Sequence, residues 1–468
     1  MLLETLRSAF AGRLLLDDAE KAPYLTDWRS KWTGRALAVV QPDSAADVAA
    51  VVRWCIANDA VVVPQGGNTG MSGAATPDDS GRAVVVSLAR MNRIRDLDAI
   101  NNTMTVEAGC VLQSIQEEAE RNDRLFPLSL SAEGSCMIGG NLSTNAGGVG
   151  VLRFGNARDL CLGLEVVTAE GEIWNGLRGL RKDNSGYDLR DLFIGAEGTL
   201  GIITAATLKL FPLPRARLCA WASVANVDDA LAILALAQQK IGARLTAFEL
   251  MSNNCVDLLL EQFPALRWPT SERSAWYVLL EVSDPDGDIE ANAALESVLE
   301  LAFEKSLLSD ATIATNLSQT HEFWALRENM GEAQVKAGKN IKHDISVPIS
   351  KFPSFIAATN ALIESQFSDA RMIVFGHLGD GNLHYNVSPK TGATGERFTQ
   401  IEPAINRIVH DAVDACGGSI SAEHGLGVLR RNEALRYKSD VEMKLQRAIK
   451  HALDPRGIMN PGKGMGAV

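Results

Sequence analysis

The stretch Pro64-Gln65-Gly66-Gly67-Asn68-Thr69-Gly70-Met71-Ser72-Gly73 follows a short strand-helix-strand pattern and gives the first signal about the fold. The pattern predicts strands over 37–40 and 61–63 with a helix over 44–58 between them. Residues without bulky side chains let successive backbone N–H groups converge on an anion. The loop lacks the Lys-Ser/Thr ending of a triphosphate loop and the GxGxxG spacing of a dinucleotide fingerprint, so neither ATP nor NAD is indicated. Taken alone, it could equally be a glycine-rich turn.

Two further glycine-rich segments lie in the same half of the chain. The first, within 131–148, contains Ile138-Gly139-Gly140-Asn141-Leu142-Ser143-Thr144-Asn145-Ala146-Gly147-Gly148. The second contains Gly195-Ala196-Glu197-Gly198-Thr199-Leu200-Gly201-Ile202. Glycines this dense within one block indicate backbone that packs closely against a ligand. The three segments together therefore predict a ligand site in the N-terminal half.

A change of pattern marks the domain boundary. Strand and helix patterns alternate up to Pro212-Leu213-Pro214, which favours a break in the fold. Beyond it, a strand-helix-strand-helix block predicts a ferredoxin-like α+β domain, with strands over 219–224 and 276–282 and helices over 227–240 and 288–305. We therefore expect an α+β protein with a first domain over 1–213, a cap over 214–415 and a C-terminal segment over 416–468 that returns to the first domain.

The chemistry is concentrated in Phe375-Gly376-His377-Leu378-Gly379-Asp380-Gly381-Asn382-Leu383-His384 and, downstream, Ser421-Ala422-Glu423-His424-Gly425. The Asp-Gly pair favours a tight hairpin turn, which would place His377 and His384 opposite each other on paired strands. Glu423 would add a third metal ligand and leave one position open, as in catalytic Zn²⁺ sites. His424 would then be free to act as a base. The alternative is that these are strand-end histidines beside a sharp turn.

Composition limits the class of protein. The chain has 468 residues, which is too long for one core, and a formal net charge of −12, which argues against nucleic acid or an anionic membrane as partner. We expect no transmembrane segment, because no apolar run approaches the length of about 18 residues that a spanning helix needs. The chain has 7 cysteines, an odd number, and no CxxC pair; most of them have apolar sequence neighbours. That pattern favours buried free thiols in a reducing cytoplasm.

The glycine-rich segments and the histidine segments together resemble a known family. The PxGGxTG, IGGN-x-x-TNAGG and GxEGTLGI segments, with the terminal Asp454-Pro455-Arg456-Gly457-Ile458-Met459-Asn460-Pro461-Gly462-Lys463, resemble the vanillyl-alcohol-oxidase-type FAD-binding fold. The GHLGDGNLH and SAEHG segments are similar to its D-2-hydroxyglutarate, D-lactate and glycolate dehydrogenase branch. The resemblance runs from about Trp28 to Lys463.

The resemblance implies a set of FAD-binding residues and a substrate site. The first segment would hold the pyrophosphate, the second would line the isoalloxazine and ribityl, the third would contact the adenine side, and Asn460 would reach the flavin from the C-terminus. Because the first loop has no histidine and Cys136 is out of register, a non-covalent FAD is expected. The implied cofactor residues are Pro64, Gln65, Gly66, Gly67, Asn68, Thr69, Gly70, Ser72, Pro127, Glu133, Gly139, Gly140, Asn141, Thr144, Asn145, Gly147, Gly148, Glu197, Gly198, Gly201, Ile202 and Asn460.

On the substrate side, Arg327 and Lys342 match residues that grip carboxylates in the resembled dehydrogenases, and arginine suits bidentate carboxylate binding. Asn386 lies two residues past His384, on the same face of the expected strand, and is a candidate for hydrogen-bonding the substrate. The 2-hydroxyglutarate enzymes tend to carry a hydroxyl residue four positions after the arginine, where this chain has Gly331. For any single cation, the alternative is a solvated surface charge.

These residues predict a D-2-hydroxyacid dehydrogenase in which FAD accepts a hydride, Zn²⁺ or a similar metal acidifies the hydroxyl and His424 takes the proton. D-2-hydroxyglutarate is the first candidate substrate, with D-lactate or glycolate as alternatives. A zinc hydrolase and a non-catalytic flavin subunit are the competing classes. Without a nicotinamide motif, we expect an electron-transferring flavoprotein or a quinone as acceptor. The resemblance also suggests a homodimer.

Overall fold

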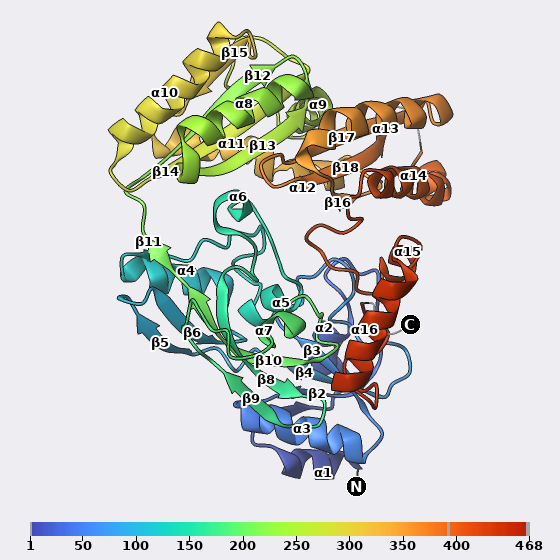
Figure 1. Ribbon diagram of the computed structural model, residues 1–468. Helices are drawn as coiled ribbons and strands as arrows, with labels where there is room; N and C mark the ends of the chain where they lie inside the picture. The colour runs from blue at the N-terminus through green and yellow to red at the C-terminus, as the bar shows by residue number, and fades with distance from the viewer. Residues whose placement is uncertain (1, 391–393, 465–468) are drawn as a thin grey trace. The chain divides into compact units, whose positions relative to one another are not determined.

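The computed structural model describes residues 2–390 and 394–464 and divides into two compact units (Figure 1). Unit 1 comprises residues 1–148, 155–213 and 423–468, and unit 2 comprises residues 149–154 and 214–422. The chain passes from unit 1 to unit 2 after Leu213 and returns to unit 1 at Glu423.

The first sheet of unit 1 has the strand order β1-β2-β4-β3, with β2, β3 and β4 parallel and β1 antiparallel to β2. Its three parallel strands are rich in buried valine, as expected of strands covered on both faces. Helix α3 begins after Ser44, whose Oγ accepts the Asp47 N–H. The elements are α1 (Leu2–Ala9), β1 (Arg13–Leu15), α2 (Asp18–Leu25), β2 (Ala36–Gln41), α3 (Ala45–Ala57), β3 (Val61–Gln65) and β4 (Ala83–Ser87).

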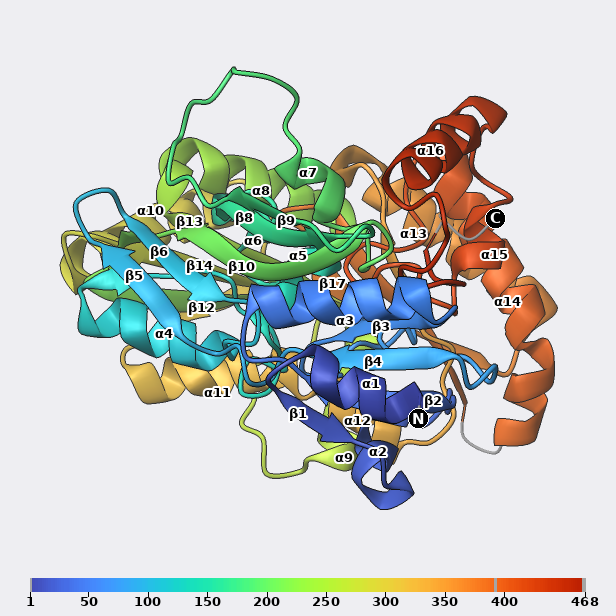
Figure 2. The same ribbon diagram turned by 90° about the horizontal axis from the view of Figure 1, so that it is seen from below.

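The second sheet of unit 1 is antiparallel, with the order β5-β6-β10-β8-β9. Helix α3 lies between the two sheets and packs against β3 and against β8 and β9 (Figure 2). The elements are β5 (Ile94–Asp98), β6 (Thr103–Glu107), α4 (Leu112–Arg121), α5 (Ile138–Ser143), β8 (Cys161–Thr168), β9 (Ile173–Gly176), α7 (Arg190–Phe193) and β10 (Gly201–Lys209), with β7 (Arg124–Leu125) and β11 (Phe211–Pro212) paired separately.

The C-terminal segment is tied back to the first sheet of unit 1. It contains α15 (Arg431–Ala434) and α16 (Asp440–Leu453). After α16, Val62 N–H donates to Ile458 O and Asn460 N–H donates to Val62 O, at 2.8 and 2.7 Å. The residues after Asp454 are therefore fixed beside β3, the strand that leads into the first glycine-rich loop.

Unit 2 is built on one seven-stranded sheet with the order β15-β12-β14-β13-β17-β18-β16. Its first part has the element order of a ferredoxin-like domain with one additional helix, α9. That part contains β12 (Ala216–Val224), α8 (Val227–Lys240), β13 (Leu245–Ser252), α9 (Asn253–Gln262), β14 (Trp276–Asp284), α10 (Asp288–Glu304) and β15 (Asp310–Ile313). Strand β13 was not predicted, because every residue of it is buried and it shows no alternation.

The second part of unit 2 extends the sheet with a hairpin and a short edge strand. It contains α11 (Leu317–Glu328), α12 (Met330–Lys336), β16 (Asp344–Ser346), α13 (Phe352–Gln366), β17 (Ala370–His377), β18 (Asn382–Pro389) and α14 (Gly395–Ala415), and residues 149–154 contribute α6 (Val151–Phe154). Strand β13 pairs with β17, so the histidine hairpin is continuous with the ferredoxin-like sheet. This extension carries the histidines of the site.

Candidate active site

The three glycine-rich segments meet in unit 1. A Cβ on Gly67 would lie 2.1 Å from Ser135 O, and a Cβ on Gly198 would lie 2.4 Å from Pro64 Cγ. These two glycines therefore let the segments pack closely against one another. The segments enclose a cavity that is lined by Pro64, Gln65, Gly66, Ala74, Ala75, Leu88, Gly139, Gly140, Ser143, Thr144, Glu197, Gly198, Gly201, Ile202 and Ile203.

Several groups around this cavity have no partner in the protein. The backbone N–H groups of residues 66–70 donate no hydrogen bond to any residue that the structure describes. Within the same described ranges, Oδ1 of Asn141 and Oδ1 of Asn460 are buried and have no donor. A Cβ on Gly140 would meet no atom within 4 Å. A row of free amides, buried polar atoms and an uncrowded helix surface fit a dinucleotide cofactor.

Other predicted cofactor residues are engaged within the protein. The Gln65 amide donates to Tyr24 O and Ala75 O, and Asn68 Nδ2 donates to Thr26 O. Asn145 Oδ1 accepts the Arg158 N–H. The predicted residues that do not line the cavity are Gly67, Asn68, Thr69, Gly70, Ser72, Pro127, Glu133, Asn141, Asn145, Gly147, Gly148 and Asn460.

Ser72 and Glu197 hold the backbone that follows Glu423. Ser72 Oγ donates to His424 O at 3.2 Å, and the Glu197 carboxylate accepts the N–H groups of Leu426 and Gly427 at 2.8 and 2.7 Å. Burial raises the pKa of Glu197. The side chains predicted to touch the cofactor therefore position the segment that contains His424.

Gly140 provides a test of the cavity. Because a side chain there would enter the cavity without meeting protein atoms, Gly140→Leu should fold normally and lose affinity for FAD by on the order of tenfold or more, which is 1.4 kcal/mol or more. Titration of the apoprotein with FAD, followed by flavin fluorescence, measures the loss. Gly331→Leu is the matched control, since Gly331 is also helical and uncrowded but lies in unit 2. Equal affinities in both variants would place FAD elsewhere.

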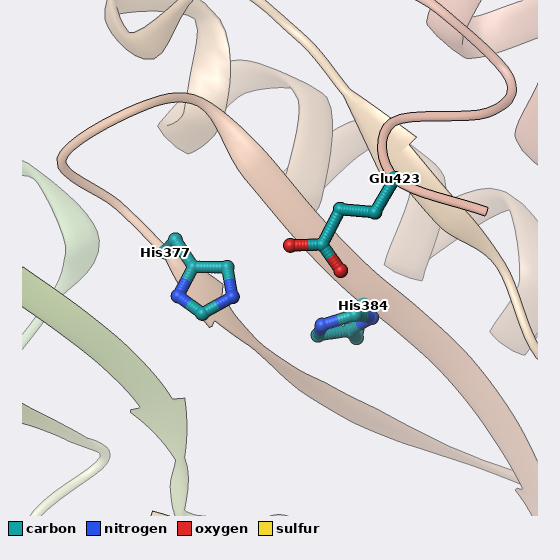
Figure 3. Close-up of side chains that lie close together, drawn as sticks. All are labelled: His377, His384 and Glu423. Atoms are coloured by element: carbon teal, nitrogen blue, oxygen red, sulfur yellow. The ribbon is translucent and has the colours of Figure 1, made fainter. Parts of the chain in front are cut away.

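His377, His384 and Glu423 form a possible metal centre (Figure 3). Each offers one ligand atom, and these atoms all lie within 4.8 Å of one another. Two imidazoles and one carboxylate are a ligand set that Zn²⁺ accepts, with a further position open. The residues thus fit a divalent ion, as the sequence predicted from their spacing.

The hairpin differs in register from the one expected. His384 pairs with Phe375, and His377 pairs across the other edge of β17 with Glu249, so the two histidines are diagonal neighbours and not directly opposite. The reason is that the turn is not a two-residue one, since β17 ends at His377 and β18 begins at Asn382. The imidazole centroids are nevertheless only 6.0 Å apart.

The segment before Glu423 runs beside β16. Ser346 and Ser419 exchange backbone hydrogen bonds of 2.9 and 2.8 Å, and Ala422 N–H donates to Asp344 O. A Cβ on Gly418 would lie 2.2 Å from Ser346 O, so this close approach requires glycine. Because Asp344 is the register partner of His384, this pairing brings Glu423 to the histidines.

A buried glutamate that the sequence did not reveal joins the metal centre to Arg327. Glu249 on β13 is 1% exposed; its Oε1 accepts from His377 Nδ1 at 2.6 Å and its Oε2 accepts from Arg327 Nε at 2.7 Å. Burial alone would raise the pKa of Glu249, but the charges of His377 and Arg327 outweigh it and lower the pKa to about 2. No local pattern marks Glu249, because its partners are 128 and 78 residues away in the sequence.

The predicted substrate residues divide into two groups. Arg327 uses Nε for Glu249, and its two terminal nitrogens make no hydrogen bond with any residue in the described part of the chain, so they can receive a carboxylate. Lys342 is half-buried just before β16. Asn386 is 3% exposed; it accepts the His343 N–H and donates to Gln334 Oε1. Both of these hydrogen bonds join Asn386 to protein groups, and its contact with substrate stays a prediction.

Comparison with known proteins identifies the domains and the fold. Residues 36–176 match an FAD binding domain, and residues 213–464 match the C-terminal domain of FAD linked oxidases. The fold resembles p-cresol methylhydroxylase (TM-score 0.76, 16% identity, 99% of this chain and 96% of that one). It also resembles 4-ethylphenol oxidase from Gulosibacter chungangensis (TM-score 0.70, 20% identity, 99% and 96%). The protein is thus a flavoprotein with the vanillyl-alcohol-oxidase-type fold.

Sequence relatives specify the family. The chain is 37% identical to D-2-hydroxyglutarate dehydrogenase of Xanthomonas citri pv. viticola, over 97% of this chain and 94% of the relative. It is 38% identical to the mitochondrial D-2-hydroxyglutarate dehydrogenase of Arabidopsis thaliana (94% and 76%) and 33% identical to D-2-hydroxyglutarate–pyruvate transhydrogenase of Saccharomyces cerevisiae (95% and 89%). The chain belongs to the FAD-dependent D-2-hydroxyacid dehydrogenases, which act on the CH–OH group of donors.

Within residues 2–390 and 394–464, no helix is both long enough and apolar enough to cross a bilayer.

Proposed function

We propose that the protein oxidises D-2-hydroxyglutarate to 2-oxoglutarate with a divalent metal ion at His377, His384 and Glu423. The observation that carries the proposal is this ligand cluster, joined through Glu249 to Arg327. A Lewis-acid site and a carboxylate-binding cation that share one buried glutamate support the oxidation of a hydroxyacid. The names of the relatives favour a 2-hydroxyglutarate substrate.

Each residue then has a defined task. FAD, when bound, supplies the hydride acceptor. A divalent ion, when bound, polarises the substrate hydroxyl. The terminal nitrogens of Arg327 bind the substrate carboxylate and fix its orientation. The imidazole of His424 accepts the hydroxyl proton. The hydroxyl of Ser72 donates a hydrogen bond to the backbone carbonyl of His424 and so fixes the position of the His424 backbone.

A dicarboxylate suits the two cations Arg327 and Lys342, since each can take one carboxylate group. Gly331 leaves open the position where related 2-hydroxyglutarate enzymes tend to have a hydroxyl, and a side chain there would meet no atom within 4 Å. Because Gly331 offers no hydroxyl to bind a distal carboxylate, this position favours the second candidate, a shorter substrate such as D-lactate or glycolate.

Substrate choice is tested by mixing the FAD-loaded protein anaerobically with single hydroxyacids. D-2-hydroxyglutarate should bleach the flavin band near roughly 450 nm faster than D-lactate or glycolate, and the L enantiomer should not bleach it, because cofactor, metal and Arg327 define three fixed points. Faster bleaching by D-lactate would select the second candidate. A protein that purifies and reconstitutes without flavin would favour the zinc hydrolase.

His424 is tested by replacement. His424→Ala should lower kcat by about two powers of ten or more, the usual effect of removing a positioned base, while FAD and metal contents stay at the native level. Single-turnover flavin reduction measures this rate. His451→Ala, an exposed histidine on α16, is the matched control. A normal rate in His424→Ala would assign the proton to another group.

The acceptor, oligomer and compartment remain predictions. We propose an electron-transferring flavoprotein or a quinone as acceptor, because the sequence has no nicotinamide motif, and a homodimer as the assembly. The cysteines that the structure describes are free thiols, and all but Cys416 are buried. Free thiols support a reducing compartment such as the cytoplasm. Several relatives carry mitochondrial names.

A further inference from the structure

We propose that Glu249 is a positioning residue that couples metal affinity to substrate affinity, by orienting His377 and Arg327 with the two oxygens of one carboxylate. The inference rests on the proposed function, because the metal and the substrate carboxylate are parts of it. Glu249 is not one of the clustered metal ligands. Its effect is therefore exerted through the residues that it holds.

The bond to His377 selects the ligand nitrogen. Because His377 Nδ1–H donates to Glu249 at 2.6 Å, Nε2 is the nitrogen that faces away from Glu249 and can bind a metal. A carboxylate on the far nitrogen fixes the tautomer and the ring orientation of a metal-bound histidine and raises its basicity. Loss of such a partner typically weakens metal binding by about 10–100-fold.

The bond to Arg327 leaves its terminal nitrogens for substrate. Glu249 takes Nε at 2.7 Å, and the guanidinium lies 4.8 Å from the Phe375 ring centroid. The Phe375 ring in turn packs 4.9 Å from the His384 ring. Arg327 is thus fixed from both sides, and each side leads to a metal-ligand histidine.

The surroundings of Glu249 make this arrangement rigid. Its neighbours on the same face of β13, Ala247 and Met251, belong to a buried apolar cluster that includes Phe375 and Leu326. A carboxylate buried among apolar groups has no water to replace a lost partner, so it holds both partners firmly. A buried ion pair contributes little to the stability of a fold, because removing the charges from water costs free energy. The presence of Glu249 here therefore favours a role in the site.

The decisive experiment measures metal and substrate binding separately. Glu249→Gln keeps the shape but loses the charge, and its amide NH₂ must face either His377 Nδ1–H or Arg327 Nε–H. We expect the Zn²⁺ dissociation constant, measured by chelator competition on FAD-loaded protein without substrate, to rise about 10–100-fold. The KM for D-2-hydroxyglutarate should rise at least tenfold as well, with FAD affinity unchanged.

Two further variants separate positioning from folding. Glu281→Gln is the matched control, because Glu281 is also buried on this sheet and also anchors α11, through Trp324 Nε1 at 2.9 Å, but it contacts neither His377 nor Arg327. It should leave both constants near native values. Glu249→Asp retains the charge with a shorter reach, and serves if the glutamine variant misfolds; it should weaken both constants.

The outcomes are distinguishable. Native metal and substrate constants in folded Glu249→Gln and Glu249→Asp would overturn the proposal, as would equal effects in Glu281→Gln. If only one constant changed, the coupling would be refuted. If the native protein bound no divalent ion, both this inference and the proposed metal would fail, whereas native metal binding with turnover of a different hydroxyacid would refute only the proposed substrate.

Discussion

His384→Ala is expected to abolish turnover while FAD stays bound. The substitution leaves His377 and Glu423 as the remaining ligands of the cluster, which is too few to hold a divalent ion firmly. A metal that polarises an oxygen contributes several kcal/mol to the transition state, so kcat should fall by about three powers of ten or more. The FAD cavity lies in unit 1 and His384 lies in unit 2, so the flavin content should not change.

The measurement combines metal content, flavin absorbance and the rate of flavin reduction. His321→Ala is the matched control, since His321 is an exposed histidine of unit 2 on α11. Exhaustive chelation of the native protein should reproduce the loss, and Zn²⁺ should restore the rate to the native protein but not to His384→Ala. Turnover that survives both chelation and His384→Ala would remove the metal from the mechanism.

Local sequence signals were sufficient for most of the fold. The helix α8 has the predicted bounds, and Ser44 caps α3 as its side chain indicated, because caps and apolar periodicity act over a few residues. The strand-helix-strand-helix alternation that indicated a ferredoxin-like cap was also recognisable, although β13 was missed. The spacing of the histidine segments led to the proposed ligand set, and the structure brings these three side chains together.

Long-range pairing was not accessible in this way. Every residue of β13 is buried, so the strand shows no alternation of polar and apolar residues, and nothing near it in the sequence indicates that it lies between β14 and β17. The register of the hairpin depends on the length of the turn, and the Asp-Gly pair does not indicate that the turn is longer than two residues. The roles of Ser72 and Glu197 depend on contacts with residues more than 200 positions away. Tertiary packing decides such features.

Arg327→Ala is expected to lower kcat/KM for D-2-hydroxyglutarate by a few powers of ten. Removing one partner of a desolvated charge pair costs about 2–5 kcal/mol, and Arg327 is only 9% exposed. Part of the cost comes from Glu249, which would lose one of its two partners. Arg327→Lys separates the two effects, because it keeps a positive charge near Glu249 but cannot offer a planar fork to a carboxylate.

Steady-state kinetics with flavin-reduction rates measure this loss, and thermal melting reports any change in stability. Arg217→Ala is the matched control, since Arg217 pairs with the buried Glu281 on the same sheet and lies outside the proposed site. We expect Arg327→Lys to melt closer to the native temperature than Arg327→Ala and yet to remain impaired in KM, because the fork and not the charge orients the substrate. If Arg327→Ala and Lys342→Ala both left the kinetics unchanged, the substrate carboxylates would have to bind to other residues, and the link from Glu249 to Arg327 would be purely structural.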